Sequence, residues 1–136
     1  MPPMDVYTDG ASKGNPGPAG WAFVIGDELH SGSLECQTNN YAELYAIFQA
    51  VAHAQPASSI RILTDSMCCI NWLTGRWRCH QPQAAKLLEL IHFLKEAKDL
   101  HCTIKHVRGH SGDPGNERAD GAASLEAAQL RARQEG

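Results

Sequence analysis

The sequence of 136 residues lacks a long hydrophobic run, an internal repeat and a stretch of biased composition. A helix that spans a bilayer needs about 20 consecutive apolar residues. The most apolar helical stretch, around Tyr41–Val51, is interrupted by polar residues, and no basic segment precedes an apolar one at the start. These absences predict a soluble, cytoplasmic protein with no membrane partner.

Cysteine pairs of the C-x-x-C kind are also absent. The five cysteines are an odd number and nothing marks secretion, which disfavours a disulfide framework. The adjacent cysteine–histidine pairs are Cys79-His80 and His101-Cys102, and their spacing fits no standard zinc site. We therefore expect reduced thiols and give little weight to a zinc or thiol enzyme.

A strong net charge is missing as well. The formal charge of -3 neither favours nor excludes nucleic acid, so a polyanionic partner would be held by local basic groups or by metal ions. The length and the 43% hydrophobic content suffice for one domain with its own core. Because no Gly/Ser-rich or Pro-rich linker divides the chain, we expect a single domain over residues 1–136, with no separate substrate-binding domain.

The sequence does contain an ordered series of strand and helix patterns. Apolar or alternating runs predict strands at 4–9, 20–25, 28–34, 59–64 and 103–107, with a hairpin turn at Gly26-Asp27. Helical spacing predicts helices at 41–52, 66–73, 82–100 and from 116 to about 133, with Asn40 and Asn116 as N-caps. The order predicts an α/β protein in which a mixed sheet, with three antiparallel strands first, carries helices.

Two of these strands end on the same Thr-Asp pair, at Asp9 and at Asp65. The intervening helix supplies the crossover that parallel strands require, so both aspartates would emerge at one sheet edge. Ligands usually bind at the carboxyl ends of parallel strands. The alternatives are that Asp9 stabilises the Gly-rich turn that follows it and that Asp65 caps the next helix.

Two further acids, Glu43 and Asp120, stand on predicted helices. Glu43 begins a helix at the same sheet edge, where its alternative role is the N3 partner in a capping box. Asp120 is on the last helix, where the default for an acid is solvent exposure. Four carboxylates brought together would repel one another, and hard divalent cations such as magnesium or manganese would relieve that repulsion.

The segments TDGASKGNPGPAGWA, TNNYAEL, ILTDS and HVRGHSGDPGNERAD follow one another in this order. Together they closely resemble the type 1 ribonuclease H family over nearly the whole chain. The resemblance implies the ribonuclease H-like fold, a five-stranded mixed sheet flanked by helices. It also implies a monomeric endoribonuclease that hydrolyses the RNA strand of RNA/DNA hybrids.

The resemblance implies roles for particular residues. Asp9, Glu43, Asp65 and Asp120 match the four metal-binding acids of the family, which use two Mg²⁺ ions, with Mn²⁺ as a substitute, and leave 5′-phosphate and 3′-hydroxyl ends. His110 matches a mobile-loop histidine that moves protons or helps product leave. The family positions that contact the hybrid are matched by Gly10, Ala11, Asn15, Thr38, Asn39 and Asn40. Turn formation and helix capping remain alternative roles for the asparagines.

The chain departs from the better-known bacterial pattern at two places. Met67 stands where glutamine is common, and the segment 72–83 is shorter than the basic extension that many members use to hold the hybrid. Arg76, Trp77 and Arg78 form its remnant, although a tryptophan near a helix end is as often part of the core. We therefore expect hybrid binding that is weaker and more sensitive to salt than in members with the extension, with cleavage still supported by metal. The alternatives are a binding module without catalysis and another nuclease or strand-transfer enzyme of the superfamily.

Overall fold

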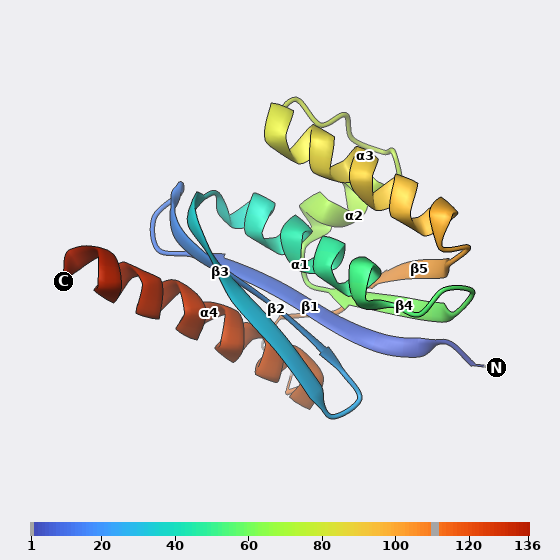
Figure 1. Ribbon diagram of the computed structural model, residues 1–136, viewed down its shortest axis with the longest axis horizontal. Coiled ribbons are helices and arrows are strands. Elements are labelled where there is room, and N and C mark those ends of the chain that lie inside the picture. Colours follow the sequence, from blue (N-terminus) through green and yellow to red (C-terminus); the bar gives the residue numbers. More distant parts are fainter. Residues whose placement is uncertain (1, 110–111) are drawn as a thin grey trace.

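A computed structural model describes residues 2–109 and 112–136 of the chain. The strands form a five-stranded mixed sheet in the order β3-β2-β1-β4-β5 (Figure 1). The elements in chain order are β1 (Met4–Ser12), β2 (Gly17–Ile25), β3 (Glu28–Gln37), α1 (Asn39–His53), β4 (Ser59–Thr64), α2 (Met67–Leu73), α3 (Pro82–Ala97), β5 (His101–His106) and α4 (Pro114–Glu135). The predicted fold class is therefore confirmed.

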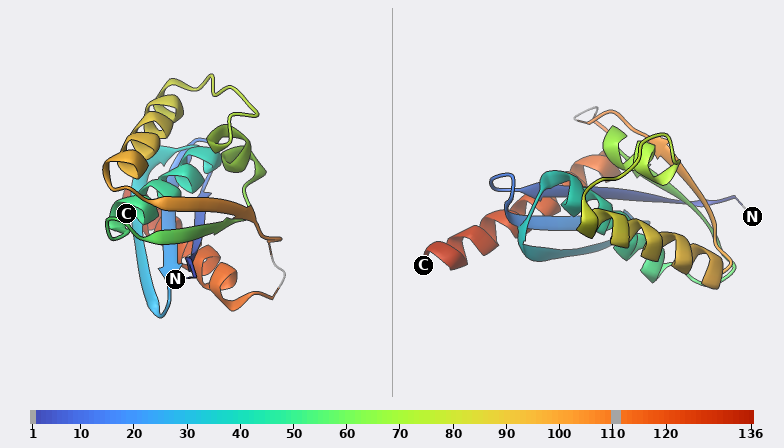
Figure 2. Two further views of the ribbon diagram at one scale, coloured as in Figure 1. Left: turned by 90° about the vertical axis from the view of Figure 1, so that its right-hand side faces the viewer. Right: turned by 90° about the horizontal axis from the view of Figure 1, so that it is seen from above.

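The sheet has helices on both faces. Helices α1 and α3 pack together on one face, and α4 lies across β1, β2 and β3 on the other (Figures 1 and 2). The larger core lies under α1 and α3 and contains large apolar side chains, among them Phe23, Leu44, Ile47, Ile62 and Ile91. No helix within 2–109 or 112–136 combines the length and the apolar character that crossing a membrane would require.

The α4 face is built from small residues instead. Ala119 and Ala123 are fully buried against Ala22 and Val24 of β2. A Cβ atom on Gly20 would lie 2.1 Å from the Ala123 carbonyl oxygen. This close approach brings the backbone of α4 down onto the sheet, and with it the acidic residue Asp120.

The strand pairing corrects the expectation that the first strand ends at Asp9. β1 pairs in parallel with β4 only over Met4–Tyr7, whereas its antiparallel pairing with β2 continues to Ser12. The glycine-rich sequence resembles a loop, but β2 supplies the hydrogen-bonding partner that keeps it extended. Asp9 therefore lies inside β1, just beyond the end of the pairing with β4.

The caps of α1 and α4 also differ from the expected ones. Thr38 caps α1, where its hydroxyl accepts a 3.1 Å hydrogen bond from the Tyr41 N–H, so Asn40 lies inside the first turn. Asp113, not Asn116, caps α4. With Thr38 as N-cap, the N3 position belongs to Tyr41, which removes the capping-box role considered for Glu43. Helical spacing locates a helix, but side-chain geometry decides which of several polar residues caps it.

Gly10 sets the position of α1 relative to β1. A Cβ atom there would lie 2.3 Å from both the Ala42 carbonyl carbon and the Glu43 backbone nitrogen. These are backbone atoms of a packed helix, which cannot move aside as the end of a side chain can. The glycine therefore permits the contact that holds the first turns of α1, and Glu43 with them, against the strand.

Gly10→Ala should lower the free energy of unfolding by about 2 kcal/mol or more, because the added methyl group overpacks a backbone contact. Urea denaturation measures this loss. Gly121→Ala is the matched control, since a Cβ on Gly121 meets nothing within 4 Å in the α4 interior. That change should raise stability by up to about 1 kcal/mol. Equal effects of the two substitutions would contradict the role assigned to Gly10.

Candidate metal centre at the edge of β1 and β4

Three carboxylates converge where the parallel pairing of β1 with β4 ends. Asp9 on β1, Glu43 on α1 and Asp65 directly after β4 each offer an oxygen, and these oxygens lie within 4.8 Å of one another. The Asp9 residue is 4% exposed and Glu43 is 9% exposed. Among the described residues, none of the three acids forms an ion pair with a cationic side chain. Such a group is unusual when two of its members are buried, because burial disfavours the charged form.

The local structure supports this placement of Asp9. One carboxylate oxygen of Asp9 accepts a 2.9 Å hydrogen bond from the Gly10 N–H, and the residue pairs across the sheet with Ala22. Within the described residues, no hydrogen bond connects Asp9 to the turn that follows β1. The alternative role as a turn-stabilising residue is therefore not supported by the structure.

Asp65 lies in the short connection between β4 and α2. Ser66, not Asp65, caps α2, and its hydroxyl accepts a 3.1 Å hydrogen bond from the Cys69 N–H. The capping alternative for Asp65 is therefore wrong, and its carboxylate is available to the cluster. The chain after β5 passes close by, since a Cβ on Gly109 would lie 2.9 Å from an Asp65 carboxylate oxygen.

Asp120 approaches the same cluster from α4, and its partial burial contradicts plain solvent exposure. Its carboxyl group contributes to raising the pKa of both Asp9 and Asp65. The start of α4 is anchored on β1, where the Tyr7 hydroxyl donates a 2.9 Å hydrogen bond to Asp113. Gly115 fits against the ring of Tyr7, which a Cβ would meet at 2.4 Å. All four acids suggested by the sequence therefore influence one site.

Burial and mutual repulsion favour protonated carboxyl groups in this cluster. Burial, followed by the negative charge of Asp65, raises the pKa of Asp9 to about 9. Burial raises the pKa of Glu43 to about 7, opposed by the Ser66 hydroxyl. Burial and the Asp120 charge also raise the pKa of Asp65. A divalent cation would replace these protons, because it stabilises the ionised carboxylates that bind it.

Several residues proposed to contact the substrate surround the start of α1. The Asn15 side-chain oxygen accepts a 3.0 Å hydrogen bond from the Asn39 N–H, and the Asn39 side-chain oxygen accepts one of 3.2 Å from the Ser12 N–H. Asn15, Asn39 and Asn40 are exposed, whereas Thr38 is half-buried as the cap. Gly10 is buried under α1 and Ala11 is half-buried. The asparagines thus also join the loop after β1 to the helix.

The basic remnant lies on the segment between α2 and α3. Arg76, Trp77 and Arg78 are all exposed, with Trp77 at 53%, so the alternative of a core tryptophan is wrong. The backbone N–H of Trp77 donates a 3.1 Å hydrogen bond to the backbone carbonyl of Asn71, which holds the segment against α2. Met67, at the start of α2, is 44% exposed. His110 lies outside the described residues.

The sequence did not identify Ser66 as part of this site, and it assigned Asn116 only to a helix cap. Ser66 is 6% exposed. Its hydroxyl caps α2, and its hydrogen bond also lowers the pKa of Glu43. Asn116 is 2% exposed, and its side-chain oxygen has no hydrogen-bond partner among the described residues. The Ser66 role could have been suspected from its place between Asp65 and a predicted helix. The burial of Asn116 has no comparable signal, because its pattern is also that of a helix cap.

Comparison with known proteins gives a consistent result. The family model described as RNase H matches residues 1–128. Ribonuclease HI of Pseudomonas aeruginosa PAO1 is 39% identical over 139 residues, covering 92% of this chain and 93% of the relative. The crystal structure of RNase H1 from Halobacterium salinarum NRC-1 is 30% identical with a TM-score of 0.76, covering 94% and 99% of the two chains. LC11-RNase H1 in complex with an RNA/DNA hybrid shares the fold at 23% identity and a TM-score of 0.79, covering 93% and 97%.

The raised pKa of Asp9 predicts how the stability of the metal-free protein depends on pH. The folded chain holds a proton that the unfolded chain releases above the ordinary pKa of 3.8, so stability should fall as the pH rises from about 4 toward 9. Asp9→Asn removes this loss and keeps the oxygen that accepts from Gly10. With a chelator present, it should be more stable than the native protein at pH 8 by at least about 1 kcal/mol, and the gain should shrink at pH 5.

Urea denaturation at the two pH values measures this difference. Glu89→Gln on the exposed side of α3 is the control for loss of one negative charge, and it should change stability little at either pH. A gain for Asp9→Asn that is the same at pH 5 and pH 8 would show that the Asp9 carboxyl group does not carry the raised pKa.

Proposed function

The chain belongs to the RNase H family and is an endoribonuclease, and we propose that it hydrolyses the RNA strand of RNA/DNA hybrids by a two-metal-ion reaction. The observation that carries this proposal is the convergence of Asp9, Glu43 and Asp65, with Asp120 beside them, where the parallel pairing of β1 and β4 ends. These acids come from separate segments of the chain. Their meeting has no evident structural benefit, because burial and repulsion oppose it.

The donor set fits hard divalent cations. Every candidate ligand is a carboxylate oxygen, which suits Mg²⁺ and also Mn²⁺. The other three acids all raise the pKa of Asp9, and we assign Asp9, Glu43, Asp65 and Asp120 together to hold the ions. When bound, the two ions would activate the attacking water and stabilise the leaving 3′ oxygen, so that the products carry 5′-phosphate and 3′-hydroxyl ends.

The exposed asparagines support recognition of the minor groove. The side-chain oxygens of Asn15 and Asn39 already accept hydrogen bonds from the protein, which leaves their NH₂ groups as donors. Such donors can reach 2′-hydroxyl oxygens and base acceptors, and the 2′-hydroxyl distinguishes RNA from DNA. Asn40 lies beside them on the first turn of α1. Ala11 and the backbone of Gly10 border the same surface, and Thr38 is assigned to a phosphate of the DNA strand.

A second surface contacts the hybrid farther along the chain. Met67 begins α2 next to Asp65 and is exposed, so its thioether can touch a base edge without donating a hydrogen bond. We assign Trp77 to a deoxyribose and Arg76 and Arg78 to phosphates. Two arginines neutralise few phosphates, so their electrostatic contribution to binding should be small. That contribution should decrease further as the salt concentration rises. His110 is assigned to proton transfer or product release, as its position in the motif suggests.

Cleavage of a hybrid with labelled RNA tests the central proposal. In the presence of Mg²⁺ or Mn²⁺, the native protein should cut only the RNA strand of the hybrid, leaving single-stranded RNA, duplex RNA and duplex DNA intact. A chelator should stop the reaction. Asp9→Asn should lower the rate by at least about a hundredfold, because a neutral amide is a weaker ligand than a carboxylate for the divalent cations on which the reaction would depend.

Glu89→Gln serves again as the charge-matched control and should cleave at the native rate. Cleavage that survives in Asp9→Asn would remove Asp9 from the reaction. Tight binding of the hybrid without cleavage by the native protein would instead identify a binding module. Detection of 3′-phosphate ends would contradict the assigned chemistry.

The Arg76→Ala/Arg78→Ala double variant should raise KM with little change in kcat, because it removes ground-state interactions with phosphates. The slope of log affinity against log salt concentration should become shallower by up to about 2, because each arginine is expected to neutralise one phosphate. Cleavage kinetics at several salt concentrations provide the measurement. Arg133→Ala at the exposed end of α4 is the control. An unchanged salt slope in the double variant would place the hybrid elsewhere.

A further inference from the structure

Glu28, His30 and His53 form a second cluster of potential metal ligands, at the opposite end of α1 from the acidic site. Glu28 and His30 follow the Gly26-Asp27 turn on β3, and His53 is the last residue of α1. Ten residues separate Glu43 from His53, which corresponds to about 15 Å along the helix. The two clusters are therefore separate sites joined by one rigid element.

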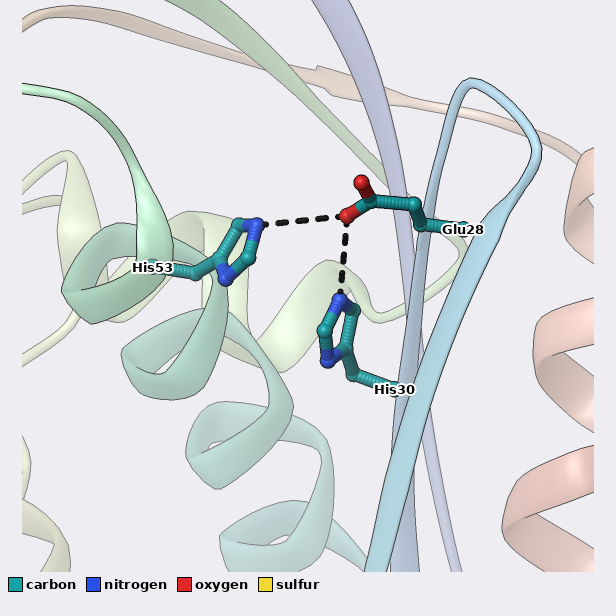
Figure 3. A group of neighbouring side chains, drawn as sticks. All are labelled: Glu28, His30 and His53. Atoms are coloured by element: carbon teal, nitrogen blue, oxygen red, sulfur yellow. Dashed lines mark hydrogen bonds and ion pairs between the residues drawn. The ribbon is translucent and has the colours of Figure 1, made fainter.

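The three side chains point toward one another (Figure 3). The Nε2 atom of His30 lies 3.2 Å, and that of His53 3.5 Å, from the same carboxylate oxygen of Glu28. Zinc bonds to nitrogen and oxygen of about 2.0–2.2 Å at tetrahedral angles separate neighbouring ligand atoms by about 3.3–3.5 Å. The 3.5 Å separation equals the upper end of this range and the 3.2 Å separation lies just below it, so both are close to the edges of a zinc coordination tetrahedron.

The two imidazoles are held in place by an aromatic support. Phe23, which is 2% exposed, stacks on His30 with ring centroids 4.7 Å apart and the planes 13° from parallel. It also contacts the His53 ring at 5.4 Å. The hairpin turn is tied to α4, because the Arg118 guanidinium donates a 3.0 Å hydrogen bond to the Asp27 carbonyl. Ligands on supported elements lose less conformational freedom when they bind an ion.

An ordinary pair of surface ion contacts is the alternative explanation of this geometry. The side chains of His30, His53 and Glu28 are 39%, 40% and 64% exposed, and exposed ion pairs contribute little to stability. That weak attraction does not by itself favour two Nε2 atoms meeting at a single oxygen. Two imidazoles and one carboxylate are, in contrast, the donor set of known three-ligand zinc sites that leave a fourth position to water.

We propose that Glu28, His30 and His53 bind a borderline-soft transition metal ion, which we assign as Zn²⁺. The bound ion would brace the β2–β3 hairpin against the end of α1. Imidazole nitrogen selects such ions, whereas the all-oxygen cluster of Asp9, Glu43 and Asp65 selects Mg²⁺. The proposal does not depend on the activity assigned to the acidic site.

Titration with Co²⁺ as a spectroscopic probe for Zn²⁺, in excess Mg²⁺ to occupy the acidic cluster, tests the proposal. The native protein should bind one Co²⁺ with visible absorption of a four- or five-coordinate nitrogen–oxygen site, and Zn²⁺ should displace it. The His30→Gln/His53→Gln double variant should lose this ion. Glu28→Gln, at a position whose side chain is 64% exposed, should weaken binding of the ion by at least about tenfold, because it replaces a carboxylate ligand with an amide.

The control is the His92→Gln/His101→Gln double variant, which removes two exposed histidines outside the cluster and should bind Co²⁺ as the native protein does. Thermal denaturation gives an independent readout. At Zn²⁺ concentrations about a hundredfold above Kd, Tm should rise by about 5–10 °C in the native protein and the control. It should not rise in the His30→Gln/His53→Gln variant.

Three results would overturn the proposal. They are absence of a bound ion in the native protein, equal binding by the His30→Gln/His53→Gln and native proteins, and intense near-ultraviolet sulfur-to-cobalt absorption. The last result would assign the ion to cysteines. Because none of these readouts uses the hybrid, failure of the proposed cleavage activity would leave the outcome unaffected.

Discussion

The contact between β1 and α1 at Gly10 is the constraint on which the rest of the site depends. It brings the helix backbone within reach of the strand, so that Glu43 points toward Asp9 rather than toward solvent. Any side chain at position 10 would need the space that the Ala42 and Glu43 backbone occupies. The carboxylate arrangement is therefore a consequence of backbone packing, and the negative charges of the acids oppose it.

Electrostatics works against the folded state at this point. Burial and the neighbouring negative charges favour protonated Asp9 and Glu43, and a protein without cations would be more stable if these residues were neutral. The stabilising interactions lie elsewhere, in the core under α1 and α3 and in the packing of α4 on β2. Because stability comes from these regions, the fold can hold the carboxyl groups close together at the place where we propose that hard cations and phosphates bind.

Helix α1 connects two sites of different chemistry. Its first turns carry a carboxylate into an all-oxygen cluster, and its last residue carries an imidazole toward Glu28 and His30. The buried ring of Phe23 lies under the second cluster, on the strand that pairs with both β1 and β3. A metal ion that braces the hairpin against the helix end would act on the same rigid frame that positions Glu43. The two donor sets differ enough for each to select its own ion.

The sequence by itself determined the order of the elements and the sheet class, and it suggested the four candidate acids, because hydrophobic periodicity and short motifs are local properties of the chain. It also indicated that Asp9 and Asp65 would share an edge, since a crossover helix separates them. Only the tertiary structure decided that β1 continues past Asp9, that Thr38 and Asp113 are the caps, and that Trp77 is exposed. It alone brought Glu28, His30 and His53 together. Each of these depends on distances between atoms of remote segments, which no local pattern encodes.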